Sequence, residues 1–584
     1  SRAADVDRSF GNTAEILAFL SEFTGMKYPY SVYRQVCVTD FLFGGMENIT
    51  ATTLTPLVLD DELGNLDEEH HDLIAHEAAH QWFGDLITCN DWSHIWLNEG
   101  FATYMTELYF EATRGVEEFR ARMRNTQEDY MRADVGRARR PTVWNVYKEP
   151  DDLFDELVYE GAACRLHLLR FVLGDEVFRD AVRGYVEEYA GRNVDTDDFQ
   201  RAAEEASGRD LDWFFQQWFH GRGYPEFRFD WEWDEARRTV VVDVEQMQEF
   251  HDGTPAVFRT PVEIEVREPA GISLHRLEID ERKERFELAA DAKPLYVRFD
   301  KHGWIPKGMI WRRSPREWIA IANRDDDVNG RRDAVRALGG IAAEARRAGR
   351  GTHEVYVREL VARLRGDPSP YVRLEAAPAL GKAGGLEARK RLRSAAGDDP
   401  DPRVRVAALD ALHAWGESAD LARFAREEFA VRFSWNTMAA AAGLVCSADS
   451  DGAYDWIVSR LSVESPHDQL AGKLLGHLAG LDDGRVPDRL LAAARNGALH
   501  PNARAEAVRG IGKLPKRRIT HSRALGELLD VEDFRLRHAV VEALAELKNP
   551  QSRRLLEAYY PEALTPTERR AIEGALEKHV GGRR

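Results

Sequence analysis

The residues of this chain best suited to chemistry are two histidines and two glutamates between positions 76 and 99. His76 and His80 stand four apart in His-Glu-Ala-Ala-His, so a helix would present both imidazoles on one face, to one metal ion. Glu99, in Trp-Leu-Asn-Glu-Gly-Phe-Ala on a second predicted helix, adds an oxygen ligand. Two histidines and one glutamate leave the fourth tetrahedral position of zinc open for water, as catalytic sites do. Glu77 lies beside them, placed to serve that water as a base.

Two other interpretations of these residues stay open at this point. An ordinary helix can carry two histidines in its core or on its surface without binding any metal. Cys89 could replace Glu99, since thiolate is also a good zinc ligand. Glu99 is preferred, because cysteine is commonly a small buried hydrophobe. The sequence therefore predicts one zinc ion per chain, bound by His76, His80 and Glu99.

A second motif, Gly-Gly-Met-Glu-Asn, occupies residues 44–48 and follows a predicted strand over residues 32–43. A pair of glycines lets an extended backbone lie close against a ligand. Glu47 would then project its carboxylate at the end of the strand. The alternative is an edge strand that simply closes in a turn.

Together these motifs closely resemble the zinc aminopeptidases of the aminopeptidase N type, which are gluzincins. The resemblance runs from about Lys27 to about Pro225, with several independent motifs in the same order. The family's exopeptidase string is usually Gly-Ala-Met-Glu-Asn, and here Gly45 replaces the alanine.

The resemblance implies a role for each matching residue. His76, His80 and Glu99 would bind zinc, and Glu77 would be the general base. Glu47, helped by Glu99, would hold the free α-ammonium group of a peptide, so N-acylated peptides should be rejected. The implied site for this α-amine consists of Gly44, Gly45, Met46, Glu47 and Asn48.

A further segment, residues 159–163, reads Tyr-Glu-Gly-Ala-Ala where the family has approximately Tyr-Glu-Lys-Gly-Ala. Without a gap, Tyr159 aligns with the tyrosine that donates a hydrogen bond to the tetrahedral oxyanion. Aligning the glycines instead would place Val158 there and disable that role. The ungapped match is preferred, although a tyrosine that only packs at a helix start is the main rival.

Composition narrows the remaining function classes. The chain has 584 residues, and its formal charge of -20 argues against a nucleic-acid partner. Its 4 cysteines show no CxxC spacing, which fits a reducing compartment, and no apolar stretch is long enough to span a membrane. A cytoplasmic location is expected on these grounds.

The pattern predicts an α+β multidomain protein. Residues 1–222 would form a mostly helical domain with a short strand-rich start, and the resemblance implies that this is a thermolysin-like zinc peptidase domain. In residues 223–306 apolar and polar residues alternate, which predicts the strands of a small β-sandwich. Residues 307–584 are helical and repetitive, which predicts a HEAT-like helical repeat domain. The predicted helices of the first domain cover residues 72–86, 99–112, 156–173 and 198–219.

The repeats are identified from similar helical segments that each carry an arginine at the equivalent position. Successive arginines are separated by 32, 99 and 33 residues, and the middle gap holds about three periods. Helix-like segments near Met438 and Ala471 fall where two further units belong. The arginines are Arg373, Arg405, Arg504 and Arg537. Stacked helix pairs with this period form a solenoid, whereas a plain helical bundle would need no period.

The expected activity is removal of N-terminal amino acids from peptides with a free N-terminus. The alternative is an inactive aminopeptidase-like scaffold that binds partners through its repeats; epoxide hydrolysis, as in one relative, is a third option. The chain begins at Ser1 without methionine, and family members carry a large β-rich domain before this point. We therefore expect either that this sequence is a fragment or that the β-rich domain is supplied by a separate chain.

Overall fold

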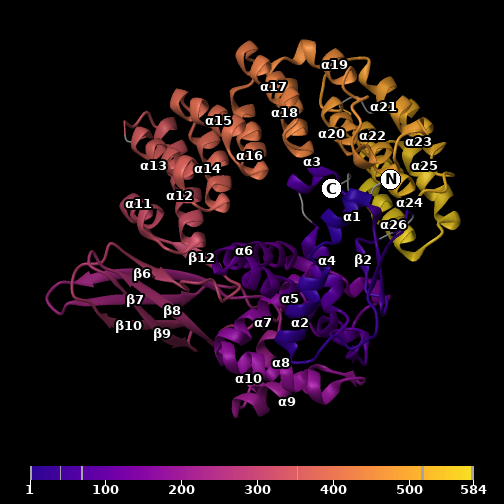
Figure 1. Cartoon of the computed structure of the whole chain (residues 1–584). Coiled ribbons are helices and arrows are strands. Elements are labelled where there is room, and N and C mark those ends of the chain that lie inside the picture. The colour runs from indigo at the N-terminus through magenta and orange to yellow at the C-terminus, as the bar shows by residue number, and fades with distance from the viewer. Residues whose placement is uncertain are drawn as a thin grey trace.

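The computed structural model describes residues 3–39, 41, 43–67, 70–351, 353–514 and 519–580. Three regions follow one another along the chain (Figure 1): a mostly helical N-terminal region, a two-sheet sandwich and a long curved series of helices. The order matches the predicted architecture of a helical domain, a β-sandwich and an α-solenoid.

The N-terminal region begins with helices, so the prediction of a strand-rich start was wrong. α1 (Ala3–Phe10) and α2 (Thr13–Thr24) precede a small sheet of order β1-β3-β2. The strands are β1 (Arg34–Cys37), β2 (Gly45–Met46) and β3 (Ala51–Leu54). Among the described residues of the predicted strand over residues 32–43, only β1 is extended in the sheet, and the Gly-Gly-Met-Glu-Asn motif pairs separately with β3.

Helix α5 (Trp96–Arg114) is buried from Trp96 to Phe110 except at the partly exposed Thr103, and other helices of this region pack against it. The single helix predicted over residues 198–219 is two helices, because Gly208 takes a left-handed φ of 65° and ends the first. The helices are α3 (Glu62–Asp67), α4 (His71–Ala79), α6 (Val116–Ala133), α7 (Glu160–Leu173), α8 (Asp175–Tyr189), α9 (Thr196–Ser207) and α10 (Asp212–Trp218).

The sandwich consists of a four-stranded sheet of order β10-β7-β6-β12 and a three-stranded sheet of order β11-β8-β9. β12 lies beyond the predicted boundary at residue 306 and pairs parallel with β6, so the strands continue further than expected. The strands are β6 (Glu226–Asp234), β7 (Thr239–Gln246), β8 (Thr260–Arg267), β9 (Ile272–Ile279), β10 (Lys283–Ala289), β11 (Tyr296–Phe299) and β12 (Gly308–Trp311).

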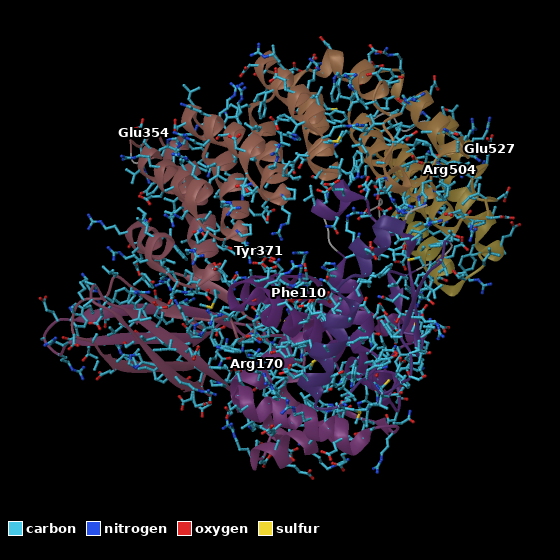
Figure 2. All side chains as sticks on the ribbon, in the orientation of Figure 1. Phe110, Arg170, Glu354, Tyr371, Arg504 and Glu527 are labelled. Carbon is cyan, nitrogen blue, oxygen red and sulfur yellow. The ribbon has the colours of Figure 1, made fainter. Side chains whose placement is uncertain are left out.

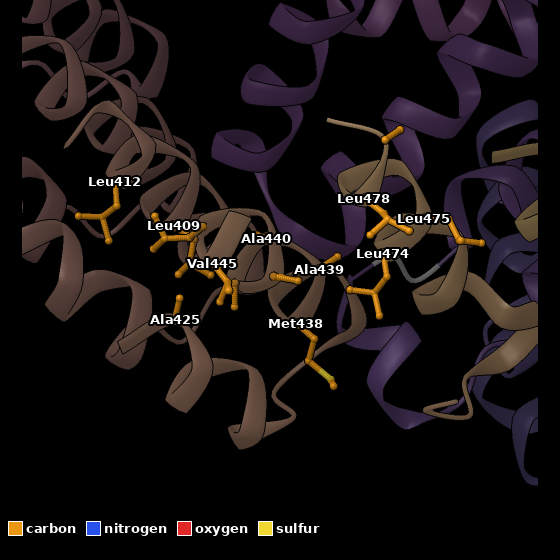
Figure 3. Packing of buried hydrophobic residues seen from close by; sticks show 14 of the residues in the cluster. Leu409, Leu412, Ala425, Met438, Ala439, Ala440, Val445, Leu474, Leu475 and Leu478 are labelled. Carbon is orange, nitrogen blue, oxygen red and sulfur yellow. The ribbon is translucent and has the colours of Figure 1, made fainter. Parts of the chain in front are cut away.

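The solenoid contains helices α11 to α26, and its even-numbered helices from α12 onward stack in sequence. Small residues allow this close stacking: a Cβ added to Gly381 would lie 3.1 Å from the Cβ of Ala411, and Gly512 faces Ala543 in the same way. Met438 lies on α18 and Ala471 on α20, where the repeat predicted two units. Figure 3 shows buried leucine and alanine side chains on these two helices and on the two helices that precede α18.

The helices of the solenoid have the following bounds: α11 (Pro315–Arg324), α12 (Val328–Arg347), α13 (His353–Gly366), α14 (Pro370–Ala383), α15 (Leu386–Asp398), α16 (Pro402–Leu412), α17 (Ala419–Val431), α18 (Trp435–Ala448), α19 (Ser450–Val458), α20 (Gln469–Leu478), α21 (Val486–Arg495), α22 (Pro501–Lys513), α23 (Ile519–Gly526), α24 (Phe534–Leu547), α25 (Pro550–Tyr559) and α26 (Pro566–Val580). Within the part of the chain that the structure describes, no helix has the length and apolar character needed to cross a bilayer.

The solenoid arches back over the N-terminal region (Figure 1). Among the described residues, hydrogen bonds and ion pairs join the two regions near the start, in the middle and at the end of the solenoid. At its start, Tyr371 on α14 donates a hydrogen bond to Glu118 on α6 (2.8 Å), near the centre of Figure 2. In its middle, the Trp435 indole donates to Asp61 (2.9 Å). At its end, Arg570 on α26 pairs with Asp151, in the 3-10 turn η4 (Pro150–Leu153).

Candidate metal centre

The candidate metal ligands come from the end of α4 and the first turn of α5, and the structure brings all three together. The Nε2 atoms of His76 and His80 are 3.1 Å apart, and the Glu99 Oε2 lies 3.4 Å and 3.2 Å from them. Zinc–ligand bonds of about 2.0–2.1 Å at tetrahedral angles separate ligand atoms by about 3.3 Å. The donor set and its spacing therefore fit a zinc ion.

The local fold orients His80 for this role. The helix predicted over residues 72–86 ends at Ala79, so His80 is the C-terminal cap rather than a mid-helix residue. Its Nδ1 donates to the Phe83 carbonyl (2.9 Å), which leaves Nε2 as the nitrogen that faces Glu99 and could bind a metal. The turn after α4 thus fixes which nitrogen can bind metal.

Glu99 is buried, at 4% exposure, yet it is held ionised. Burial alone would raise its pKa, but the adjacent His80 and His76 lower the pKa of Glu99 to about 2. Cys89, the alternative ligand, is not among the groups close enough to share a metal with these residues. Burial and the charge of Glu99 raise the pKa of the Cys89 thiol, which further disfavours the thiolate.

Glu77 lies beside the ligands in a confined space. Its side chain is 4% exposed, and its Oε2 has no hydrogen-bond partner among the described residues. Burial, followed by the charges of Glu47 and Glu99, raises the pKa of Glu77 to about 8. A Cβ added to Gly45 would lie 2.1 Å from the Glu77 Oε1, so the glycine in place of the family's alanine gives this carboxylate its room.

Tyr159 stands immediately before α7, with its ring stacked on that of His76 at 5.9 Å between centroids and an angle of 22°. Burial and the nearby Glu99 and Glu47 raise the pKa of Tyr159, so its hydroxyl keeps its proton. Val158, the residue that a shifted alignment would use, is fully buried in the apolar core. The geometry therefore favours the ungapped match.

The departure from the family pattern after Tyr159 has a steric explanation. The guanidinium of Arg165, at 1% exposure, donates to the Gly161 carbonyl (2.6 Å), to the Tyr130 hydroxyl (2.9 Å) and to the Trp218 carbonyl. A Cβ at Gly161 would lie 2.9 Å from both Arg165 Nη1 and the Tyr130 ring. The buried arginine therefore occupies the space that a lysine at position 161 would enter.

Restoring that lysine should destabilise this protein. We expect Gly161→Lys to lower the free energy of unfolding by about 1–3 kcal/mol, because the new side chain overpacks the site of Arg165. Gly184→Lys is the matched control, since Gly184 also lies in a helix but a Cβ there meets nothing within 4 Å. Thermal denaturation of both variants is the measurement, and equal midpoints would contradict the steric account.

The Gly-Gly-Met-Glu-Asn motif lies on β2 and the turn that follows it. The Gly44 carbonyl accepts from the Thr55 amide (2.9 Å), and the Asn48 side chain donates to Thr53 (2.9 Å). Met46 is partly exposed, at 38%. The charge of Glu47 raises the pKa of both Glu77 and Asp85.

Three residues near this centre were not among the predicted site residues. Gln81 follows α4 and donates to the Glu47 carbonyl, Asp85 accepts from Gln81, and Arg165 braces the start of α7. The only feature of the sequence that could have indicated these residues is that they lie close to recognised motifs. His94, in contrast, bonds Thr196 (2.8 Å) and takes no part in the metal cluster.

Comparison with known proteins identifies two sequence families in the chain. Residues 8–218 match the peptidase family M1 domain, and residues 357–426 and 487–577 match HEAT repeats. Probable aminopeptidase 2 of Sulfurisphaera tokodaii is 27% identical over 299 residues, covering 50% of this chain and 37% of that protein. Aminopeptidase M1 of Arabidopsis thaliana is 30% identical over 218 residues, covering 36% of this chain and 25% of that protein.

Among solved structures, the crystal structure of Legionella pneumophila aminopeptidase A in complex with aspartic acid superimposes with a TM-score of 0.74. It covers 99% of this chain and 74% of that one, at 16% sequence identity, and so supports the fold. The sequence matches to the two curated relatives span a quarter to about a third of those proteins. Residues 8–218 therefore carry a peptidase M1 domain, the domain of the aminopeptidase N family, and the C-terminal part carries HEAT repeats.

Proposed function

We propose that this protein is a zinc-dependent aminopeptidase that removes N-terminal amino acids from peptides. The observation that carries the proposal is the approach of His76, His80 and Glu99 to within 3.4 Å of one another. Beside them lies the buried carboxylate of Glu77, whose Oε2 has no hydrogen-bond partner among the described residues. When bound, zinc would lower the pKa of water and polarise the substrate carbonyl.

The protein's own groups would carry the other parts of the reaction. Glu77 would accept the proton of the attacking water and deliver it to the departing amine nitrogen. The hydroxyl of Tyr159 would donate a hydrogen bond to the oxyanion that develops on the carbonyl oxygen. Glu47 would pair with the α-ammonium group, so that one residue is removed from a free N-terminus.

A panel of fluorogenic aminoacyl amides, each free or N-acetylated and assayed with and without a zinc chelator, tests this function. Chelator-sensitive release from the free amines alone is the expected result. Equal release from the acetylated substrates would contradict the exopeptidase assignment. No turnover by protein with zinc bound would favour the scaffold alternative instead.

The role of Tyr159 has a separate test. We expect Tyr159→Phe to lower kcat by about 10²–10³-fold, because a hydrogen bond to developing charge acts mainly in the transition state. KM should change little, since the phenyl ring can keep its stacking on His76. Steady-state kinetics on one free substrate is the measurement, and an unchanged kcat would exclude the oxyanion role.

A further inference from the structure

Gln81 joins the end of the metal-binding helix to the turn that carries Glu47. Its side chain is fully buried, and both its amide nitrogen and its amide oxygen have hydrogen-bond partners. The amide nitrogen donates to the Glu47 carbonyl (3.0 Å) and to the Asp85 carboxylate (2.7 Å). The amide oxygen accepts from the Thr50 backbone (3.0 Å) and the Tyr28 hydroxyl (3.1 Å).

The turn that Gln81 holds has an unfavourable backbone conformation. Thr50, a β-branched residue, has a φ of 62°, in the left-handed region that such side chains rarely adopt. A conformation of this kind persists only where surrounding contacts impose it. Gln81 contacts the turn at both ends, at the Glu47 carbonyl and at the Thr50 amide, and so contributes such contacts from the segment directly after α4.

We propose that Gln81 is a positioning residue that fixes Glu47 relative to the metal centre and thereby sets the requirement for a free N-terminal amine. The inference rests on the proposed function, because it names what holds the α-amine site of that reaction in place. A carboxylate set on a loop recognises an ammonium group selectively only when its support is rigid. Gln81 provides this support without touching the substrate.

A matched control in the sandwich distinguishes the positioning role of Gln81 from a purely structural one. Gln246 is also fully buried and also braces a loop, since its side chain donates to the Phe258 carbonyl (2.9 Å) and accepts from the Phe258 amide (2.8 Å). Methionine has nearly the same length as glutamine but forms none of these bonds. Gln81→Met and Gln246→Met therefore remove comparable interactions from two different regions.

The experiment compares the two variants with the wild type as zinc-loaded full chains. For Gln81→Met we expect the KM of free aminoacyl substrates to rise about tenfold or more, with a much smaller change in kcat. The preference for free over N-acetylated substrates should fall by a similar factor. Gln246→Met should keep both the KM and the preference, even if its melting temperature falls.

Two further measurements do not depend on turnover. Calorimetry should show that free leucine binds Gln81→Met about tenfold more weakly, with N-acetylleucine as the control ligand. Hydrogen exchange of the segment 47–50 should become faster in Gln81→Met and stay unchanged in Gln246→Met. This last comparison needs neither substrate nor ligand.

The outcomes separate the inference from the proposed function. A wild type that hydrolyses none of the substrates would reject the aminopeptidase assignment, while the exchange rates would still test the contact made by Gln81. Unchanged exchange at residues 47–50, or an unchanged KM and amine preference in Gln81→Met, would overturn the positioning role. Equal effects of both methionine variants on the amine preference would overturn it as well.

Discussion

Replacement of Glu77 with glutamine is expected to lower kcat by about 10²–10⁴-fold while bound zinc is retained. Glutamine has the same shape but cannot accept the proton of the attacking water, and a general base typically contributes a factor of this size. Zinc should stay bound because the three predicted ligands, His76, His80 and Glu99, are unchanged. The measurements are kcat on a free aminoacyl amide and the zinc content of the same sample.

The substitution should not weaken the fold. The Glu77 Oε2 has no hydrogen-bond partner among the described residues, so the amide breaks no contact there. Burial raises the pKa of this carboxyl from 4.5 to about 8, so its ionised form is disfavoured in the metal-free folded protein. Stability of the metal-free wild type should therefore fall as pH rises from about 4.5 to 8, and Glu77→Gln should remove that part of the dependence.

Glu107→Gln provides the control for this experiment. Glu107 is another buried glutamate of the N-terminal region, on α5, and it pairs with Arg122 at 2.7 Å. Its replacement should lower the melting temperature but leave kcat close to that of the wild type. A normal kcat in Glu77→Gln, or an equal loss in both variants, would exclude Glu77 as the base.

The sequence predicted the parts of the centre that depend on spacing within one helix or on short contiguous motifs. His76 and His80 had to share a face whether α4 ended at Ala79 or continued, because one helical turn separates them. The order of helical domain, sandwich and solenoid followed from changes in periodicity. The four repeat arginines lie at the starts of α14, α16, α22 and α24, as a repeated unit requires.

What the sequence could not predict depends on contacts between distant segments. The sequence predicted one long strand over residues 32–43, whereas the structure has the short β1 and a separate β2 that pairs with β3. Such pairing depends on tertiary packing, which a local pattern does not encode. The positioning role proposed for Gln81 depends on its contact with the Glu47 turn, which lies 34 residues earlier in the sequence. Gly161 looked like a weakened motif until the structure placed the Arg165 guanidinium in the same space.

Removal of one metal ligand is the second substitution with a large expected effect. In His80→Asn, the side-chain nitrogen takes the place of Nδ1 and can still donate to the Phe83 carbonyl, whereas the Nε2 ligand is absent. Mutation of a residue that only orients a ligand typically lowers the metal affinity by about 10–100-fold. Loss of the ligand itself should therefore lower the zinc affinity by at least about 100-fold. The variant should therefore lose both zinc and aminopeptidase turnover.

The matched control is His94→Asn, which keeps a polar group near Thr196 and lies outside the predicted ligand set. Zinc content after dialysis, and the rise in melting temperature when zinc is added, are the measurements. Zinc should stabilise the wild type and His94→Asn, because a metal that binds only the folded state shifts the unfolding equilibrium. Since His80→Asn keeps the hydrogen bond that shapes the turn, its failure to respond to zinc would trace to the missing nitrogen ligand. A full equivalent of zinc in His80→Asn would instead mean that the metal binds elsewhere in the chain.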